Sequence, residues 1–313
     1  MTREKPATDA DDRGPDDFTP DPDPVGSMLA VLDLSHSGAR TTEDIFTGVS
    51  QSMPFGRVFG GQVLAQSIVA AERTTPEGRA VHSMHGYFLR PGDASKGITF
   101  AVDRIHDGRS FSTRRTQAYQ EGVPIFSMIA SFQDEGPGIE HAEPMPSGLP
   151  AAEDLPDLEA HLAGVHPMSR RLFADRPLDL RHVPSPIYLT ADGEPSAHQA
   201  VWVRTRRTIP ADQHIHRAVL AYLSDLTIQE SILRAHGIAW ATPGLKVASL
   251  DHAMWWHRPG LVDDWMLYVQ ESPSARGGRG LATGRIYARD GTLIASVAQE
   301  IMVRVPAAVS EER

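Results

Sequence analysis

Residues 88–92 read Phe-Leu-Arg-Pro-Gly, and residues 256–260 read Trp-His-Arg-Pro-Gly, so the shared Arg-Pro-Gly recurs 168 residues further along the chain. After each copy comes a turn glycine and then Ile-x-Ser, at residues 122–127 and again at residues 291–296, with an offset of 169. Two matches in the same order and at nearly the same offset indicate two copies of one domain, because the repeating units of solenoid proteins are far shorter.

Each copy is predicted to contain one helix followed by a run of antiparallel strands. Apolar residues recur at helical spacing over residues 62–71, after Phe-Gly-Gly, and over about residues 211–226, after a proline. Segments of strand character, separated by Asp-Gly and Glu-Gly turns, follow each helix. The expected strands are residues 83–89, 98–106, 110–120 and 124–133, then 247–256, 265–272, 280–289 and 293–305, with leading strands at 45–49, 178–183 and 199–206.

This order of elements predicts an α+β fold of two tandem units, each a central helix wrapped by an antiparallel sheet. Two such units side by side can join their sheets and cover one edge strand each. The expected divisions of the chain are a disordered acidic tail at 1–27, a first unit at 28–135, a proline-rich linker at 136–175 with a short helix near 168–174, a second unit at 176–307 and a tail at 308–313. The first tail has eight acidic and three basic residues, too polar a composition to offset the entropy of ordering.

Composition excludes several classes of protein. The 313 residues include no cysteine, so disulfides, thiolate metal sites and a cysteine nucleophile are excluded. Much of the net charge of −10 lies in the N-terminal tail, and the mildly acidic remainder argues against a nucleic-acid partner. No apolar leader or membrane-spanning run is visible, so we expect a cytoplasmic protein with no membrane partner. We expect no cofactor and no metal: His214 and His216, two residues apart on a helix, point in different directions.

Four motifs together resemble the acyl-CoA thioesterase II (TesB-type) family. They are Val-Phe-Gly-Gly-Gln at 58–62, His-x-Tyr-Phe-Leu-Arg-Pro-Gly at 85–92, Asp-Gly-x-Ser-Phe-Ser-x-Arg-Arg at 107–115 and Asp-His-x-Met-Trp-x-His-Arg-Pro at 251–259. The resemblance covers roughly residues 30 to 305. It implies a double hotdog fold, hydrolysis of acyl-CoA thioesters and a homodimer or homotetramer. It also implies a catalytic trio that falls here on Asp225, Ser249 and Gln299, with serine at a place where members often carry threonine.

The internal repeat offers an independent test of this trio. Val-Leu-Ala at 63–65 returns at 219–221, an offset of 156 for the helices. With that offset and the strand offsets above, the first copy carries apolar residues opposite all three members of the trio, namely Val69, Val81 and Ala130. One catalytic copy and one structural copy would have this pattern.

Thioester hydrolysis requires a nucleophile, a proton acceptor and donors for the oxyanion. Without cysteine or a Gly-x-Ser-x-Gly elbow, a positioned water is favoured over a covalent acyl-enzyme. Asp225 would act as its general base, while Ser249 and Gln299 would hold the water by hydrogen bonds. Backbone N–H groups at a helix N-terminus would stabilise the oxyanion. The candidates for binding the phosphates of CoA are Arg57, Arg90, Arg114, Arg115 and Arg276.

Two other functions stay open at this point. An enoyl-CoA hydratase-like hotdog enzyme is suggested by Asp212-x-x-x-His216, which is close to a hydratase pattern of aspartate and histidine at a helix start. A non-catalytic protein that binds acyl-CoA would retain the pocket without turnover. Each residue of the trio also has an ordinary structural interpretation, as a capping aspartate, a small strand residue and an exposed glutamine.

Overall fold

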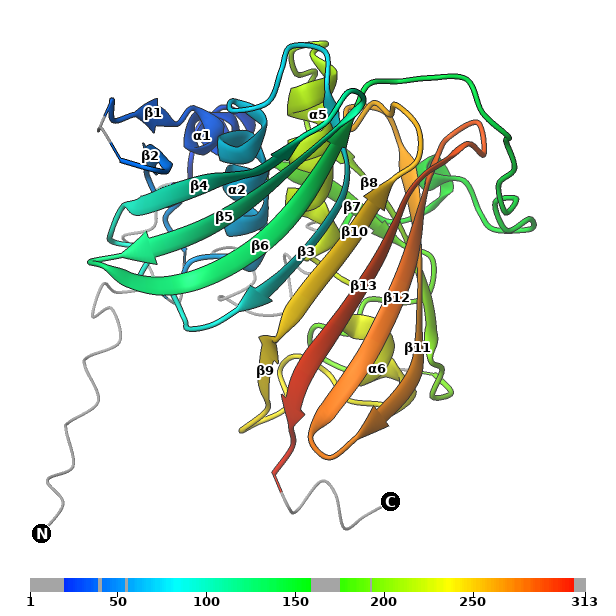
Figure 1. Ribbon diagram of the computed structural model, residues 1–313. Helices are drawn as coiled ribbons and strands as arrows, with labels where there is room; N and C mark the ends of the chain where they lie inside the picture. The colour runs from blue at the N-terminus through cyan, green and yellow to red at the C-terminus, as the bar shows by residue number, and fades with distance from the viewer. Residues whose placement is uncertain (1–19, 39–40, 54–55, 159–174, 192, 307–313) are drawn as a thin grey trace, which may run out of the picture.

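The computed structural model of the protein describes residues 20–38, 41–53, 56–158, 175–191 and 193–306 (Figure 1). The helices and strands in these ranges are α1 (Pro24–Leu32), β1 (Ser35–His36), β2 (Asp44–Gly48), α2 (Gly60–Glu72), β3 (Ala80–Phe88), β4 (Ile98–Asp107), β5 (Phe111–Gln120), β6 (Val123–Gln133), the short 3₁₀ helix η1 (Ala152–Asp154), β7 (Leu178–His182), β8 (His198–Thr205), α5 (Gln213–Ser224), α6 (Glu230–Ala235), β9 (Lys246–Ser249), β10 (Asp251–Trp256), β11 (Met266–Arg276), β12 (Arg279–Ala288) and β13 (Leu293–Arg304).

One antiparallel sheet contains every strand of the described residues. Its order is β1-β2-β4-β5-β6-β3-β10-β13-β12-β11-β8-β7, and β9 pairs with β13 next to β10. The two units meet at β3 and β10, where Tyr87 pairs with Asp251 and Ser83 with Trp255. Backbone hydrogen bonds therefore run without a break from one unit into the other, and each unit covers an edge strand of its neighbour.

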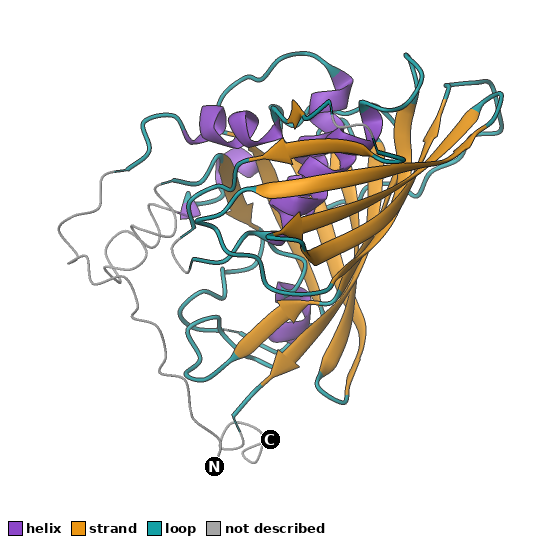
Figure 2. Cartoon of the chain, turned by 60° about the vertical axis from the view of Figure 1, so that its left-hand side comes forward, coloured by secondary structure: helices purple, strands orange, loops and turns teal. Residues whose placement is uncertain are grey.

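The sheet curves around the two long helices (Figure 2). α2 and α5 lie against each other behind the junction of the units, as Figure 1 shows. Nearly every residue of α2 from Gly61 to Ala71 is buried, so this helix is enclosed rather than amphipathic. A sheet that wraps one helix, repeated in tandem, is the double hotdog arrangement, which confirms the predicted fold class.

Several local features differ from the sequence prediction. α1 begins at Pro24 with Asp23 as its N-cap, so the last residues of the segment expected to be disordered are helical. α6 was not expected. β11 continues past residue 272 to Arg276 because a register shift between Glu271 and Ser274 accommodates the proline between them. The short helix expected near 168–174 lies outside the described residues. Within the described part of the chain, no helix has the length and hydropathy needed to cross a membrane.

Candidate active site

The predicted trio comes together at the C-terminal end of α5. Asp225 is the C-cap residue of that helix, Ser249 is the last residue of β9, and Gln299 lies in the middle of β13. Asp225 Oδ1 accepts hydrogen bonds from Gln299 Nε2 at 2.8 Å and from Ser249 Oγ at 3.2 Å. Gln299 Nε2 also donates to Ser249 Oγ at 2.5 Å. All three side chains are thus close enough to contact one small molecule.

The environment of Asp225 raises the affinity of its carboxylate for a proton. The side chain is buried, and burial raises its pKa to about 6. Hydrogen bonds from Gln299, Ser249 and the backbone N–H of Gly61 oppose this rise because they favour the ionised form. A carboxylate with a pKa near 6 is ionised at neutral pH and is still basic enough to accept a proton.

The first unit also contributes to this site, through the N-terminus of α2. A Cβ added to Gly60 would lie 2.6 Å from Asp225 Oδ2, and one added to Gly61 would lie 2.2 Å from the carbonyl oxygen of Tyr222. The two glycines therefore allow the start of α2 to approach the end of α5, because a side chain at either position would clash. The sequence predicted a purely structural first copy, whereas Gly60 and Gly61 at the start of its helix α2 bring the positive end of a helix dipole to the carboxylate.

Behind Gln299 lies a second pair of polar residues that the sequence did not connect to the site. His252 Nδ1 is 2.6 Å from Gln299 Oε1, and His252 Nε2 is 2.9 Å from Ser224 Oγ. Both His252 and Ser224 are fully buried. His85 lies in the equivalent strand of the first unit, but it pairs with Ala253 and is exposed, so it is not the counterpart of His252. Their offset is one residue short of 168, and a slip of one residue in a strand moves the side chain to the other face.

The strand register tests two of the three counterparts predicted from the repeat. Ser249 pairs with Ile301, and in the first unit Val81 pairs with Phe132. The break between β9 and β10 corresponds to a register shift after Val81 in β3, so the strands of the two units are interrupted at the same place. Val81 therefore occupies the position of Ser249 in the first copy, as the offset of 168 predicts.

Gln299 has its counterpart in β6. Gln299 pairs with Ala282 on β12, and Ala130 pairs with Arg114 on β5, which gives the two pairs the offsets of 169 and 168 found in the sequence. The structure thus places an alanine where the second copy has the glutamine.

The counterpart of Asp225 differs from the prediction. α2 and α5 begin at Gly60 and Gln213 and end at Glu72 and Ser224, so their ends correspond at offsets of 153 and 152 rather than 156. These offsets place Asp225 opposite Glu72 or its neighbour rather than opposite Val69, one helical turn away. The offset of 156 is therefore too large by about one helical turn, because the two helices share little more than apolar character.

Glu72 pairs with His214 at the opposite ends of the two helices. A cleft of about 540 Å³ lies there, and Val69 and Ile215 are among its lining residues. Because the helix ends place Glu72 opposite Asp225, this cleft lies at the position in the first unit that corresponds to the candidate active site. The Glu72–His214 pair stands there in place of the trio.

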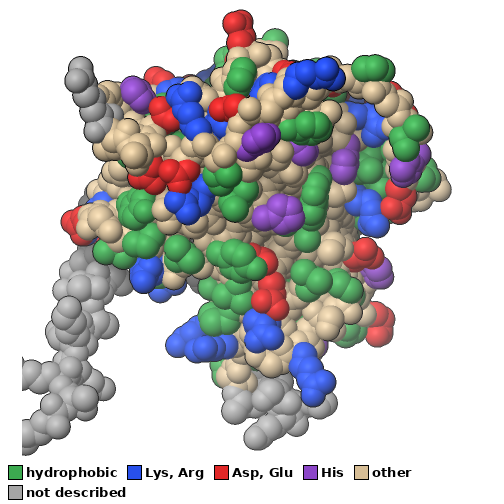
Figure 3. Space-filling model, viewed as in Figure 1, with side chains coloured by type: hydrophobic (Ala, Val, Ile, Leu, Met, Phe, Trp, Pro, Cys, Tyr) green, Lys and Arg blue, Asp and Glu red, His purple; other side chains and the backbone are tan. Residues whose placement is uncertain are grey.

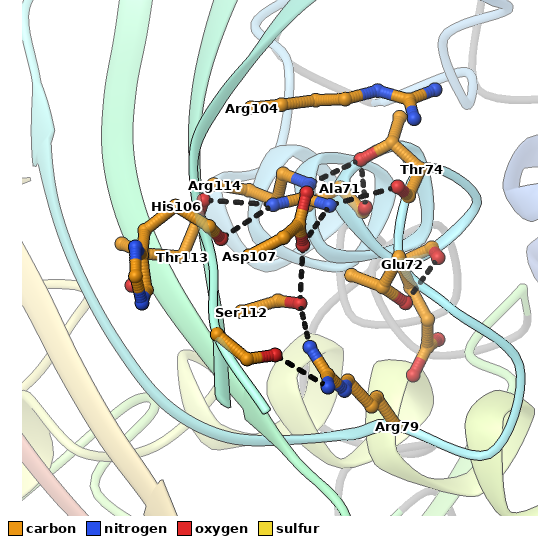
Figure 4. Close-up of polar contacts among 12 residues, drawn as sticks. Ala71, Glu72, Thr74, Arg79, Arg104, His106, Asp107, Ser112, Thr113 and Arg114 are labelled. Carbon is orange, nitrogen blue, oxygen red and sulfur yellow. Dashed lines mark hydrogen bonds and ion pairs between the residues drawn. The ribbon is translucent and has the colours of Figure 1, made fainter. Parts of the chain in front are cut away.

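The structure rules out Arg114 as a ligand for the phosphates of CoA. The side chain is fully buried, and each of its five N–H groups donates to another group of the protein (Figure 4). The acceptors are Thr74 Oγ1 and its carbonyl oxygen, the carbonyl oxygens of His106 and Thr113, and the Asp107 carboxylate. Arg114 therefore ties the β4–β5 hairpin to the end of α2, and the Arg-Arg motif contributes to folding at this position.

The other four arginines are exposed. Arg57 precedes α2 by three residues, and Arg90 follows Phe88, whose ring lies 3.1 Å from the position of a Cβ on Gly60. Both lie in segments next to the start of α2, and Arg90 Nη1 donates to the carbonyl oxygen of Pro124 at 2.9 Å. Arg115 forms an ion pair with Asp103 on the neighbouring strand. Arg276 lies at the end of β11, in the lower part of the sheet in Figure 1, where Figure 3 shows several basic side chains.

The residues that suggested a hydratase have structural roles. Asp212 is the N-cap of α5 and accepts a hydrogen bond from the backbone N–H of His214 at 2.9 Å. His216 is buried, and its Nδ1 accepts a hydrogen bond from the backbone N–H of Val262 at 3.1 Å. A capping aspartate and a histidine that anchors a loop account for the Asp-x-x-x-His spacing.

The fold and this site define a hotdog enzyme of the thioesterase class, and comparison with known proteins identifies the family. The acyl-CoA thioesterase model matches residues 171–302, and the acyl-CoA thioesterase N-terminal domain model matches residues 49–133. Acyl-CoA thioesterase 2 from Haemophilus influenzae is 39% identical over 289 residues, which cover 90% of this chain and 98% of that protein. Acyl-coenzyme A thioesterase 8 from Homo sapiens is 38% identical and covers 93% of this chain and 94% of its own.

A solved structure agrees with these relatives. The acyl-CoA thioesterase II TesB2 from Mycobacterium marinum has 40% sequence identity and a TM-score of 0.71, with 90% of this chain and 98% of that chain covered. The chain therefore belongs to the acyl-CoA thioesterase II family and is a thioester hydrolase of that family.

Proposed function

We propose that the protein hydrolyses acyl-CoA to a free fatty acid and CoA, with a water molecule activated by Asp225, Ser249 and Gln299. The observation that carries this proposal is the meeting of the three side chains. Asp225 and Gln299 are 74 positions apart in the chain, yet the carboxylate, hydroxyl and amide lie within hydrogen-bonding distance of one another. Two of the corresponding positions in the other unit, Val81 and Ala130, are apolar, so packing alone does not require polar residues there.

In this mechanism Asp225 accepts a proton from the water while the water oxygen forms a bond to the carbonyl carbon of the thioester. The pair of electrons of the C=O double bond moves to oxygen and gives a tetrahedral oxyanion. When the oxyanion collapses, the C–S bond breaks, and the proton held by Asp225 passes to the departing thiolate. General base catalysis of this kind contributes roughly 10²–10⁴-fold to the rate.

Ser249 and Gln299 would orient the water, because a hydroxyl and an amide can each donate and accept. The N-terminus of α2 would stabilise the oxyanion through its backbone N–H groups and its dipole. The two glycines support this role, since the hydrogen bond from the Gly61 N–H to Asp225 shows that the start of α2 reaches the site, and no side chain at Gly60 blocks the approach. Both units would then contribute to one reaction.

A thiol-release assay over short, medium and long acyl-CoA substrates tests the proposal. We expect wild-type protein to release CoA, and we expect Asp225→Asn, Ser249→Ala and Gln299→Ala to lose most of this rate while still folding. Ser127→Ala, which changes a half-buried strand serine of the first unit, serves as the matched control and should keep the wild-type rate. Full activity in all three site variants would contradict the mechanism. Saturable binding of acyl-CoA by wild-type protein without thiol release would favour the non-catalytic alternative.

The finer assignments are also proposals. Arg57 and Arg90 are the best placed of the arginines to meet the phosphates of CoA, because both lie in segments that adjoin the start of α2. Arg115 and Arg276 are further candidates. We propose a homodimer or homotetramer in the cytoplasm, as the family resemblance and the composition imply. Light scattering that gives the mass of one chain would contradict the assembly, and fractionation of cells would test the compartment.

A further inference from the structure

We propose that His252 is a positioning residue that fixes the orientation of the Gln299 amide at the active site. This proposal rests on the function proposed above, because it concerns how one of the three site residues is held. It is based on a continuous chain of hydrogen bonds, on the burial of every group in the chain and on the residues found at the same places in the other unit.

The direction of each hydrogen bond follows from the chemistry of the groups. The ionised Asp225 carboxylate can only accept, so Gln299 must direct its NH₂ group towards it. The amide oxygen Oε1 then faces His252 Nδ1 at 2.6 Å, which requires a hydrogen on Nδ1. In a neutral imidazole Nε2 is then an acceptor, and it lies 2.9 Å from Ser224 Oγ.

Burial keeps this imidazole neutral. His252 is fully buried, and the loss of solvation lowers its pKa to about 4. A neutral ring with one hydrogen can adopt two tautomers, and only the tautomer with the hydrogen on Nδ1 satisfies Gln299. The acceptor Gln299 Oε1 selects this tautomer, because the Ser224 hydroxyl has one hydrogen and two acceptors within reach, His252 Nε2 and the carbonyl oxygen of Ala221 at 2.8 Å.

The chain of hydrogen bonds begins and ends at the same helix end. Ser224 is the last residue of α5 and Asp225 is its C-cap, so the path Ser224–His252–Gln299–Asp225 returns to its neighbour in the sequence. Tyr268 Oη donates to the carbonyl oxygen of Ser224 at 2.9 Å and holds that end of the helix. If the donor on His252 were lost, the amide could turn and direct its oxygen towards the carboxylate, where the two acceptors would repel.

The first unit lacks this chain. Ala130, the counterpart of Gln299, pairs with Met84 on β3, so Met84 is the counterpart of His252. Both Met84 and Ala130 are buried. The hotdog core therefore accepts a methionine at this place, and a purely structural role does not require a histidine. The unit that carries the trio is also the one that carries the imidazole.

A pair of variants separates the hydrogen bond from the shape of the side chain. His252→Met introduces the residue of the other unit and removes the donor. His252→Asn keeps a donor, because asparagine Nδ2 is bonded to Cγ just as histidine Nδ1 is. We expect His252→Met to lower kcat about 10–100-fold, with KM and Tm near wild type. This is the range found when the hydrogen-bond partner of a metal-binding side chain is lost. We expect His252→Asn to restore most of kcat. Equal kcat values in these two variants would overturn the proposal.

A double-mutant cycle tests whether His252 acts through Gln299. In a Gln299→Ala background, His252→Met should cause no further loss of the residual rate, because the group that it orients is already absent. The same fold-loss in both backgrounds would overturn the proposal. Asp225→Asn serves as the reference: if it keeps the wild-type rate, the proposed function fails, whereas a loss there combined with an unaffected His252→Met refutes only the role of His252.

NMR of wild-type protein labelled with ¹⁵N-histidine reports which ring nitrogen of His252 carries the hydrogen. This measurement does not depend on activity or on whether His252→Met folds. The signals of His252 are identified by their absence from the spectrum of His252→Asn. We expect a neutral ring with its hydrogen on Nδ1 at pH 7. A hydrogen on Nε2, or a doubly protonated ring, would overturn the proposed orientation of Gln299.

Discussion

Replacing Asp225 by asparagine should stabilise the protein while it removes activity. Burial raises the pKa of this carboxyl group from 3.8 to about 6. Because one pKa unit corresponds to about 1.4 kcal/mol, the ionised carboxylate costs the folded state up to about 3 kcal/mol at neutral pH. Asparagine has a similar shape and no charge, so Asp225→Asn should recover part of this free energy of unfolding. Catalytic groups often have such a cost.

The gain should depend on pH, with a sign fixed by the raised pKa. A carboxyl group that binds its proton more tightly in the folded state contributes stability that is fully present below its unfolded pKa near 3.8 and is lost as the pH rises through about 6. At pH 8 the whole cost of about 3 kcal/mol is present, and at pH 5 about half of it remains. The difference in free energy of unfolding between Asp225→Asn and wild type should therefore be about 1.4 kcal/mol larger at pH 8 than at pH 5.

Urea denaturation of both proteins at the two pH values measures this difference, since other titrating groups are common to both and cancel. Asp154→Asn, which removes an exposed carboxylate from η1, is the control, and it should change the free energy of unfolding by less than about 0.5 kcal/mol. A difference for Asp225→Asn that is the same at pH 5 and pH 8 would refute a buried carboxylate with a raised pKa. So would a loss of stability at pH 8.

Three further outcomes follow from the same structure. The kcat/KM of wild-type protein should fall about tenfold per pH unit below about pH 6, as Asp225 becomes protonated, and a profile that is flat down to pH 5 would contradict its role as base. Gly60→Ala should abolish most thiol release because the new Cβ would lie 2.6 Å from the Asp225 carboxylate, whereas Gly138→Ala, which has open space around it, should be silent. Arg114→Leu should lower the free energy of unfolding by at least about 1–3 kcal/mol, because it leaves buried acceptors such as the carbonyl oxygen of Thr74 unpaired, but it should leave KM for acyl-CoA unchanged in the protein that folds. Arg115→Leu, at an exposed ion pair, should cost less than about 1 kcal/mol, and equal losses of stability for the two arginines would contradict this account.

The strands were predictable because their signals are local. Turn glycines and alternating apolar residues marked the hairpins, and the offsets of 168 and 169 agree with the observed register of both units. The helices were harder to align. Residues from Gly61 to Ala71 are nearly all buried, so their pattern has no polar face that would fix the position of one helix against the other. This is why Val69 was predicted opposite Asp225, where the helix ends indicate Glu72.

The members of the trio came from the family resemblance, and the structure brings them into contact. The partners of the trio could not be predicted, because they depend on contacts between distant segments. Gly61 reaches Asp225 only because α2 and α5 lie against each other, and His252 reaches Gln299 only because β10 pairs with β13. The sequence showed His252 within a motif, but it did not show which face of the strand carries the side chain. His85 is one residue out of register with His252, and it is exposed whereas His252 is buried. Burial, which raises the pKa of Asp225, is likewise a property of the folded chain.

Duplication explains how one unit could gain a polar site without losing a stable core. In a symmetric pair of hotdog units, each change at the trio would occur twice, and two buried carboxylates would each cost up to about 3 kcal/mol. In a tandem chain the two copies can differ. The second unit has Gln299 and His252, and the first has Ala130 and Met84 at the same places and keeps an apolar core there. The start of α2 lies next to Asp225 of the other unit, so in the proposed mechanism the first copy contributes its helix N-terminus as well as its half of the sheet. If Gly60→Ala and Asp225→Asn abolish thiol release equally while both proteins fold, the active site belongs to the pair of units rather than to the second one alone.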